Sequence, residues 1–272
     1  MNKFWKYGRL TLFILSCLFI AVAVIHIISA YTIDRIIAYT EISYSSPRLP
    51  KDMDGYVIAF IVDTHDIGAV KLAQIVERVN ARNVDLLLLG GDYSWHDSDE
   101  TMRILTGIKT RDGVFGVEGN HDSFKDLKRT MPKYGYTLLA DEGLGLKPGF
   151  YLGGMTFTGG DGLAPSIKNA LANARPDDFI LLLTHNPDNV QMQNSSQVDL
   201  ALAGHTHGGE VTLFGLWAPA LKQVTIYGHK FKSGWVETTH GSKMFISRGI
   251  GTSGPIRVFS QPEVIFITLK AE

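Results

Sequence analysis

Five short apolar runs, each ending in a group of polar residues, constrain the fold of this chain more than any other feature. They occupy residues 56–63, 84–92, 113–122, 179–188 and 198–209. The apolar part of each run has the length of a buried β-strand and is too short for a typical helix. Because Asp, Asn, His and Gly follow the apolar residues, each run is expected to be a strand that leads into a polar loop.

Helix-like spacing separates the first runs from one another. After the first run, apolar residues recur at every third position, at Val70, Ala73, Val76 and Val79. This spacing places them on one face of a helix, and a second helical stretch is expected around 102–108. Strand, helix and strand in succession indicate βαβ units with a largely parallel or mixed sheet. Further strand-like runs at 243–254 and 262–269 complete a single layered α/β domain.

An apolar segment at 10–33 stands apart from this domain. About 20 such residues are enough for a helix to cross a bilayer. Basic residues precede the segment at Lys3, Lys6 and Arg9. By the positive-inside tendency they keep the short tail in the cytoplasm and the body outside it. That orientation is weakened by basic residues after the segment, at Arg35, Arg48 and Lys51.

The same segment has a second interpretation, a cleaved signal peptide, since Ala-Val-Ala at 21–23 resembles a cleavage site. Apolar residues continue well beyond that point, so we expect an uncleaved anchor. The stretch after it is largely polar and contains Pro47 and Pro50, which favours a linker. The expected organisation is a cytoplasmic tail at 1–9, a transmembrane anchor at 10–33, a linker at 34–54 and a catalytic domain at 55–272.

The composition argues against a nucleic-acid-binding site and against a metal site built from cysteines. Of the 272 residues, 45% are hydrophobic and 19% are charged, and the formal net charge is −1. A chain with this balance lacks the basic footprint of a nucleic-acid-binding protein. Its single cysteine, Cys17, lies in the apolar segment, so no intrachain disulfide can form. Any metal must therefore be bound by His, Asp, Glu or Asn.

The polar residues that follow the apolar runs form a possible site. They are Asp63, His65, Asp92, Asn120, His121, His185, His205 and His207. In open α/β sheets, ligand sites lie outside the carboxyl ends of the strands. Each piece also has an ordinary explanation, such as a helix N-cap for Asp122. Their occurrence in order, each after a strand-like run, favours one shared site.

These residue types suit hydrolysis with two metal ions. Such ions lie ~3.5–4 Å apart and need a bridging carboxylate. Imidazole and carboxylate suit Zn, Mn or Fe, and an asparagine carbonyl can fill a harder position. Metals of this kind lower the pKa of a bound water, which attacks phosphorus while the opposite oxygen leaves. A neighbouring histidine could protonate that oxygen.

The ordered motifs resemble those of the calcineurin-like metallophosphoesterases. They are Asp-x-His at 63–65, Gly-Asp at 91–92, Gly-Asn-His-Asp at 119–122, His185 and Gly-His-x-His at 204–207. The resemblance extends from about residue 56 to the end. The segments "GHTHGG" and "SRGIGTSGPIR…QPEVIFITL" are further similar to a bacterial membrane-associated branch of phosphodiesterases. One departure is that Asp66 and Ile67 separate His65 from the next glycine, Gly68.

The resemblance implies a four-layer αββα sandwich with two divalent metal ions at the carboxyl ends of its strands. One ion would be held by Asp63, His65 and His207. The other would be held by Asn120, His185 and His205, with Asp92 bridging the two. His121 would act as general acid or stabilise the transition state, so the expected catalytic residues are His121, Asn120 and Asp92.

We therefore predict a membrane-tethered, metal-dependent phosphohydrolase of the phosphodiesterase or pyrophosphatase type. Its substrates would be envelope- or lipid-linked phosphate esters, and no nucleic-acid partner is expected. One alternative is a phosphomonoester or phosphoprotein phosphatase that uses the same site. Another is a non-catalytic, metal-bound scaffold at the membrane, although no ligand position is substituted.

Two further features have more than one interpretation. Arg248 could clamp a phosphate bidentately or form a structural ion pair. The stretch 217–241 interleaves aromatic residues with lysines, at Lys222, Lys230 and Lys232. Such aromatics lie either near a membrane surface, where Trp and Tyr are enriched, or in the core.

Overall fold

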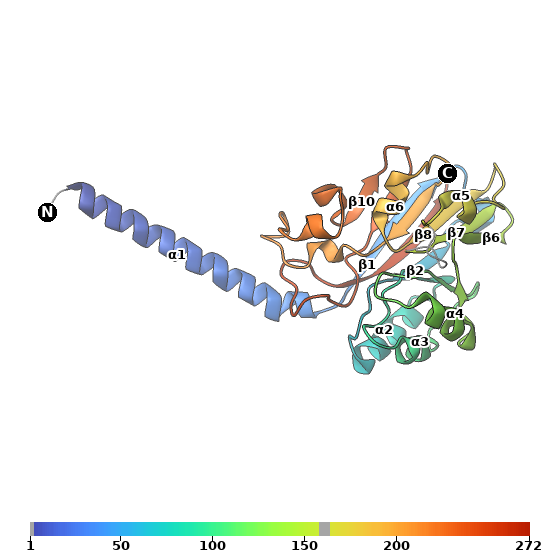
Figure 1. Ribbon diagram of the computed structural model, residues 1–272, viewed down its shortest axis with the longest axis horizontal. Coiled ribbons are helices and arrows are strands. Elements are labelled where there is room, and N and C mark those ends of the chain that lie inside the picture. Colours follow the sequence, from blue (N-terminus) through green and yellow to red (C-terminus); the bar gives the residue numbers. More distant parts are fainter. Residues whose placement is uncertain (1–2, 158–163) are drawn as a thin grey trace.

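The computed structural model describes residues 3–157 and 164–272, which form two stacked sheets and a long projecting helix (Figure 1). The first six-stranded sheet has the order β1 (Ala38–Ser46), β12 (Glu263–Ala271), β2 (Val57–Ile61), β3 (Leu86–Leu89), β4 (Val114–Gly116) and β5 (Thr137–Leu138). The second has the order β10 (Gly234–Glu237), β11 (Lys243–Ile246), β9 (Leu200–Ala203), β8 (Phe179–Thr184), β7 (Phe150–Met155) and β6 (Glu142–Lys147).

Apolar side chains on both faces of each sheet create the layers. In β2, Ile58 and Phe60 point into the core between the sheets, whereas Ala59 and Ile61 point to the opposite face. This alternation is what a strand buried on both faces requires. The predicted α/β fold class is therefore confirmed.

Helices cover the two outer faces. The outer face of the first sheet packs against α2 (Ala69–Ala81), α3 (Asp99–Leu105) and α4 (Phe124–Lys133). The outer face of the second packs against α5 (Ile167–Ala170) and α6 (Pro187–Met192). The strands β2, β3, β4 and β5 are parallel and alternate with helices, as the sequence pattern predicts. The third helix begins earlier than predicted because Asp99 and Glu100 form its first turn, where acidic residues favour the helix dipole.

The prediction of a linker over residues 34–54 is wrong. Strand β1 pairs in parallel with β12 over its whole length, from Ala38 opposite Glu263 to Ser46 opposite Ala271. An edge strand has one neighbour and a partly solvated face, so its sequence is polar without being a loop. The domain therefore begins before residue 55.

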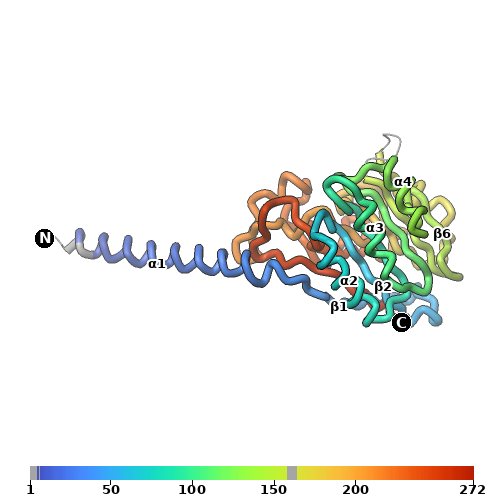
Figure 2. The backbone as a smooth tube through the Cα atoms, turned by 90° about the horizontal axis from the view of Figure 1, so that it is seen from below, coloured from blue at the N-terminus to red at the C-terminus, as the bar shows by residue number. Residues whose placement is uncertain are grey.

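The apolar segment forms α1 (Lys3–Tyr31), which projects from one end of the body (Figures 1 and 2). The stretch Tyr7–Arg35 is long and apolar enough to cross a membrane. A 3₁₀ turn (Ile33–Arg35) follows, and its buried Asp34 attaches the helix to the body. Asp34 accepts hydrogen bonds from the Ser29 hydroxyl at 2.5 Å, from Phe259 N at 2.7 Å and from Ser260 N at 3.0 Å.

Candidate metal centre

Loops that follow five strands converge at one end of the two sheets. Asp63 and His65 follow β2, Asp92 follows β3, and Asn120 follows β4. From the second sheet, His185 follows β8, and His205 and His207 follow β9. The structure brings all seven residues predicted as metal ligands into one site, with the contacts given below.

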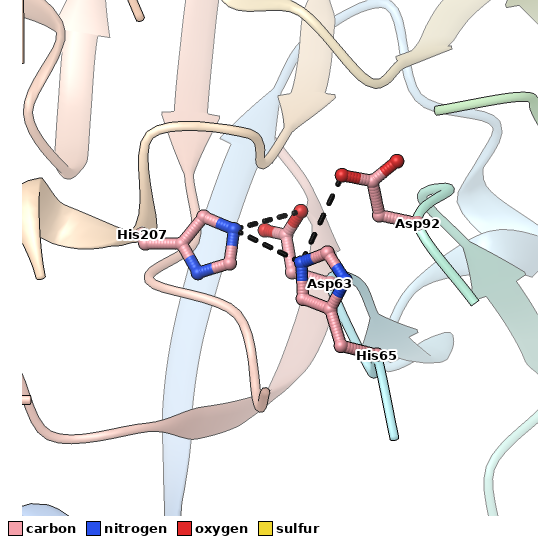
Figure 3. A group of neighbouring side chains, drawn as sticks. All are labelled: Asp63, His65, Asp92 and His207. Atoms are coloured by element: carbon pink, nitrogen blue, oxygen red, sulfur yellow. Dashed lines mark hydrogen bonds and ion pairs between the residues drawn. The ribbon is translucent and has the colours of Figure 1, made fainter. Parts of the chain in front are cut away.

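One group consists of Asp63, His65, Asp92 and His207, whose side chains point toward one another (Figure 3). All four are buried, and one ligand atom from each lies within 4.8 Å of the others. His65 Nε2 lies 3.3 Å from His207 Nε2 and 3.8 Å from Asp92 Oδ2. His207 Nε2 lies 3.6 Å from Asp63 Oδ1. This donor set fits a divalent metal ion.

A second group surrounds His185. Its Nε2 atom lies 3.0 Å from Asn120 Oδ1, 3.2 Å from His205 Nδ1 and 3.4 Å from Asp92 Oδ2. The same Asp92 oxygen faces His65 in the first group. Asp92 therefore lies between the two groups, where a bridging carboxylate would have to be.

Hydrogen bonds to the backbone orient two of these histidines. His185 Nδ1 lies 2.8 Å from the Gly90 carbonyl and His205 Nε2 lies 3.1 Å from the Val224 carbonyl. A carbonyl can only accept, so these two nitrogens donate, and the opposite ring nitrogens face the site. Metal-binding histidines are held in this way, with one nitrogen fixed by a carbonyl and the other free for the ion.

Burial keeps three of the histidines neutral. It lowers the pKa of His65 to about 4 and that of His205 to about 3, and it lowers the pKa of His207 well below its usual value. At His185 the burial effect is outweighed by Asp92 and Asp63, which raise its pKa to about 9. The carboxylates that stabilise a proton there would also attract a metal cation, which competes with that proton.

The backbone at the site is strained. Five of the predicted ligands have φ angles between 41° and 69°, namely Asp63, His65, Asp92, His205 and His207. Left-handed backbone costs roughly 1–3 kcal/mol at a residue with a side chain and clusters at functional sites. The loops of the site also pack closely against each other. Gly119 lies so near to Asp92 that a Cβ atom at this position would be 2.2 Å from Asp92 Oδ1.

A family comparison agrees with this geometry. The model of the calcineurin-like phosphoesterases matches residues 56–209, more than half of the chain. The chain belongs to the calcineurin-like phosphoesterase family. The match spans the strands and loops that carry all seven predicted ligands, and it confirms the predicted family.

Several metallophosphoesterases of known sequence are similar to this one. An uncharacterized metallophosphoesterase of Helicobacter pylori is 28% identical over 211 residues, which are 72% of this chain and 54% of the relative. The chain thus spans about half the length of that relative. The uncharacterized metallophosphoesterase YkuE of Bacillus subtilis is 27% identical over 263 residues, covering 89% of this chain and 88% of its own. A transmembrane protein with metallophosphoesterase domain from Danio rerio is 25% identical over 250 residues, which are 82% of this chain and 55% of its own.

Two aromatic rings stand at the edge of this phosphoesterase site. The His121 side chain is exposed, with its ring centroid 5.6 Å from that of His65 and 4.1 Å from that of Trp95. Trp95 stacks on His65 at 4.4 Å and 13°. Trp95 was not among the residues predicted for the site, although its position three residues after Asp92 was a usable signal.

Asp122 is not the helix N-cap that the sequence suggested. Ser123 caps α4. Asp122 instead accepts hydrogen bonds from Asp92 N at 2.7 Å and Gly119 N at 2.8 Å. It thereby joins the loops after β3 and β4, and so positions Asp92.

Two arginines near the site have structural partners. Arg248 forms an ion pair with the buried Glu263, which is the second of its two interpretations. Arg257 is buried and donates to the carbonyl oxygens of His207 and Ser260, each at 3.2 Å. Arg257 therefore helps to hold the His207 loop, a role that no local sequence signal indicated.

Proposed function

We propose that this chain is a membrane-tethered phosphohydrolase that uses two divalent metal ions to cleave phosphodiester or pyrophosphate bonds. Asp63, His65 and His207 would hold one ion, and Asn120, His185 and His205 the other. The observation that carries this proposal is the position of Asp92. Its Oδ2 atom lies 3.8 Å from His65 and 3.4 Å from His185, so one carboxylate serves both groups.

The catalytic roles follow from burial and position. Bound divalent ions would activate a water molecule and neutralise charge on the phosphate. His121 is suited to a different task because its ring is exposed beside the buried cluster. From there its imidazole can hold a proton for the leaving oxygen of the ester. Asn120 can orient the substrate or fill a ligand position through its carbonyl oxygen, which faces His185.

A cavity of about 390 Å³ supports a membrane-linked substrate. His65 and Trp95 line it at the metal centre, and Ala30 and Arg35 line it where α1 meets the body. The lining also contains Lys71, which is a second exposed cation, the buried Arg257, and the carboxylates of Asp34 and Asp66. Among the residues that the structure describes, neither Arg35 nor Lys71 forms an ion pair, so both are available to an anionic substrate.

The cavity also favours a diester or pyrophosphate over a simple monoester. A group on the far side of the phosphorus can fill the space between the cluster and α1, which a small monoester would leave empty. The apolar α1 helix and the similarity to a relative named as a transmembrane protein support membrane association. The basic residues before α1 support an extracytoplasmic body.

Turnover of bis-p-nitrophenyl phosphate with Mn²⁺ tests the proposal. Purified wild type should hydrolyse this diester faster than p-nitrophenyl phosphate. Asp92→Ala should lose both metal and turnover, whereas His121→Ala should keep the metal and lose turnover. Equal rates in all three proteins would refute the assignment of the site, and a preference for the monoester would refute the diester specificity.

A further inference from the structure

A loop segment next to α1 exposes an unusual number of large apolar side chains. We call these residues the apolar loop surface: Val211, Leu213, Phe214, Leu216, Trp217, Val224 and Ile226. Leu216 is 80% exposed, Ile226 73% and Trp217 55%. Single exposed apolar residues are ordinary on a soluble protein, but a gathering of this kind marks a contact with another apolar phase.

The backbone conformation fixes the positions of these exposed side chains. Residues 213–216 form a tight turn in which Leu216 N donates to Leu213 O at 3.0 Å. Phe214 and Gly215 have φ angles of 52° and 71°, as in a type I′ turn. This left-handed conformation is unfavourable for an aromatic residue and persists only where the surrounding structure holds it. The turn is further fixed by Lys232, whose ammonium group donates to Gly215 O.

The apolar loop surface lies beside the membrane-spanning segment. The ring of His26, on α1, is 4.7 Å from that of Phe214 and 5.0 Å from that of Phe259. Figures 1 and 2 both show the orange segment, which includes these loops, next to the end of α1 that meets the body.

The depth of this contact can be estimated from helix geometry. A hydrocarbon layer of about 30 Å takes about 20 residues at 1.5 Å each. A helix that enters the layer at Leu10 therefore leaves it near Ser29. His26 lies within that span, so Phe214, which contacts His26, reaches the edge of the hydrocarbon layer.

The charge of the segment also suits a membrane surface. Residues 211–236 contain no Asp or Glu. Lys222 and Lys230 are exposed on this segment. Lysines are attracted to an anionic bilayer, and tryptophan prefers the interface between headgroups and acyl chains.

We propose that the apolar loop surface inserts into the interfacial region of the same bilayer that α1 crosses. The occupant of this surface is the headgroup and upper acyl layer of a membrane containing anionic phospholipid. This inference rests on the proposed membrane anchoring by α1 and adds a second contact with the bilayer to it.

This contact would set the orientation of the metal centre. Val224 belongs to the apolar loop surface, and its carbonyl accepts the hydrogen bond from His205 Nε2. Thr225 donates to Asp188 on α6 at 2.6 Å, which fixes the loop to the second sheet layer. A loop seated in the bilayer thus holds the site at a constant height above the membrane, with its cavity directed to the lipid headgroups.

Fluorescence quenching in vesicles tests the insertion. The full chain is placed in vesicles of phosphatidylcholine and phosphatidylglycerol, with an environment-sensitive label on a single cysteine. Wild type carries the label at Cys17, the sole cysteine, on α1. A second protein combines Cys17→Ser with Leu216→Cys. A control combines Cys17→Ser with Lys128→Cys, which is exposed on α4 at a distance from α1 (Figure 1).

Lipids that carry a quencher near the top of the acyl chain should quench the label at position 216 and leave that at position 128 bright. A second set of lipids, with the quencher deep in the acyl chain, should quench the label at Cys17. Quenching at Cys17 by these lipids, together with a label at 216 that the upper-chain quencher leaves bright, would overturn the insertion while leaving the anchor intact. A label at Cys17 that stays bright with the deep quencher would overturn the anchor itself, and the insertion with it. If the label at 216 stays bright in vesicles and a bifunctional thiol reagent cross-links two unlabelled chains of the Leu216→Cys protein, the surface binds a second copy, which also overturns the insertion.

Discussion

Asp92 Oδ2 lies 3.4 Å from His185 Nε2 and thereby joins a loop of the first sheet to a loop of the second. The two residues are far apart in sequence and come from different layers of the sandwich. The other carboxylate oxygen of Asp92 accepts a hydrogen bond from His121 N at 2.8 Å. This carboxylate therefore connects the candidate metal ligands to the candidate acid.

Asp92→Asn should abolish metal binding at the centre and hydrolysis of the diester. The amide keeps the size of the side chain but removes the charge that faces His65 and His185. Loss of a residue that only hydrogen-bonds to a metal ligand lowers metal affinity or activity roughly 10–100-fold. We expect Asp92→Asn to lower the activity by more than this, because Asp92 is itself a candidate ligand. Metal content by mass spectrometry and turnover measure the effect. The exposed Asp126→Asn on α4 is the matched control and should bind metal like wild type.

His121→Ala should separate catalysis from metal binding. Loss of a general acid lowers kcat by about 10²–10⁴-fold. Metal content should stay at the wild-type level because the His121 ring lies outside the buried cluster. His240→Ala, at another exposed histidine, should behave like wild type. A variant that lost its metal would assign His121 to the ligand set instead.

Gly119→Ala should weaken metal binding without removing any ligand. The added methyl group would lie 2.2 Å from Asp92 Oδ1 and 2.4 Å from Asp92 N, so the Asp92 loop has to move. Overpacking of this kind costs about 1–3 kcal/mol. Thermal unfolding and metal titration report the two effects. Gly145→Ala is the control, since a Cβ there meets nothing within 4 Å; similar losses in both proteins would contradict the steric explanation.

Removal of metal by a chelator should lower the melting temperature of the protein. Without a cation, the buried carboxylates and the strained ligand residues lose the interaction that compensates their cost. Added Mn²⁺ should restore the melting temperature, and the gain should grow with metal concentration. Asp92→Asn should show little response to either treatment. A wild-type melting temperature that changes neither with chelator nor with Mn²⁺ would contradict a structural contribution from the metal.

Asp34→Asn should loosen the attachment of α1 to the body. The carboxylate accepts three hydrogen bonds, and an amide can offer only one oxygen to these donors. Leaving a buried donor without its partner costs about 1–3 kcal/mol. Limited proteolysis in detergent should cut the variant near residues 32–37 faster than wild type. The exposed Asp52→Asn should leave the cleavage rate unchanged.

The sequence alone determined the five apolar strands that lead into the predicted ligands, the order of the motifs and the family. These features are local: a buried strand shows as an apolar run, and its loop shows as glycine and polar residues directly after it. For this reason all seven predicted ligands could be named before any contact between them was known. Their individual roles in metal binding remain predictions.

Only the tertiary structure decided which distant segments meet. Strand β1 was mistaken for a linker because its partner, β12, lies at the other end of the chain, and an edge strand carries no apolar run of its own. Asp122, Trp95 and Arg257 acquire their roles through partners that lie beyond their own loops. Packing also decides the strained φ angles at the ligands. It likewise places the apolar loop surface beside α1. No short stretch of sequence encodes packing of this kind.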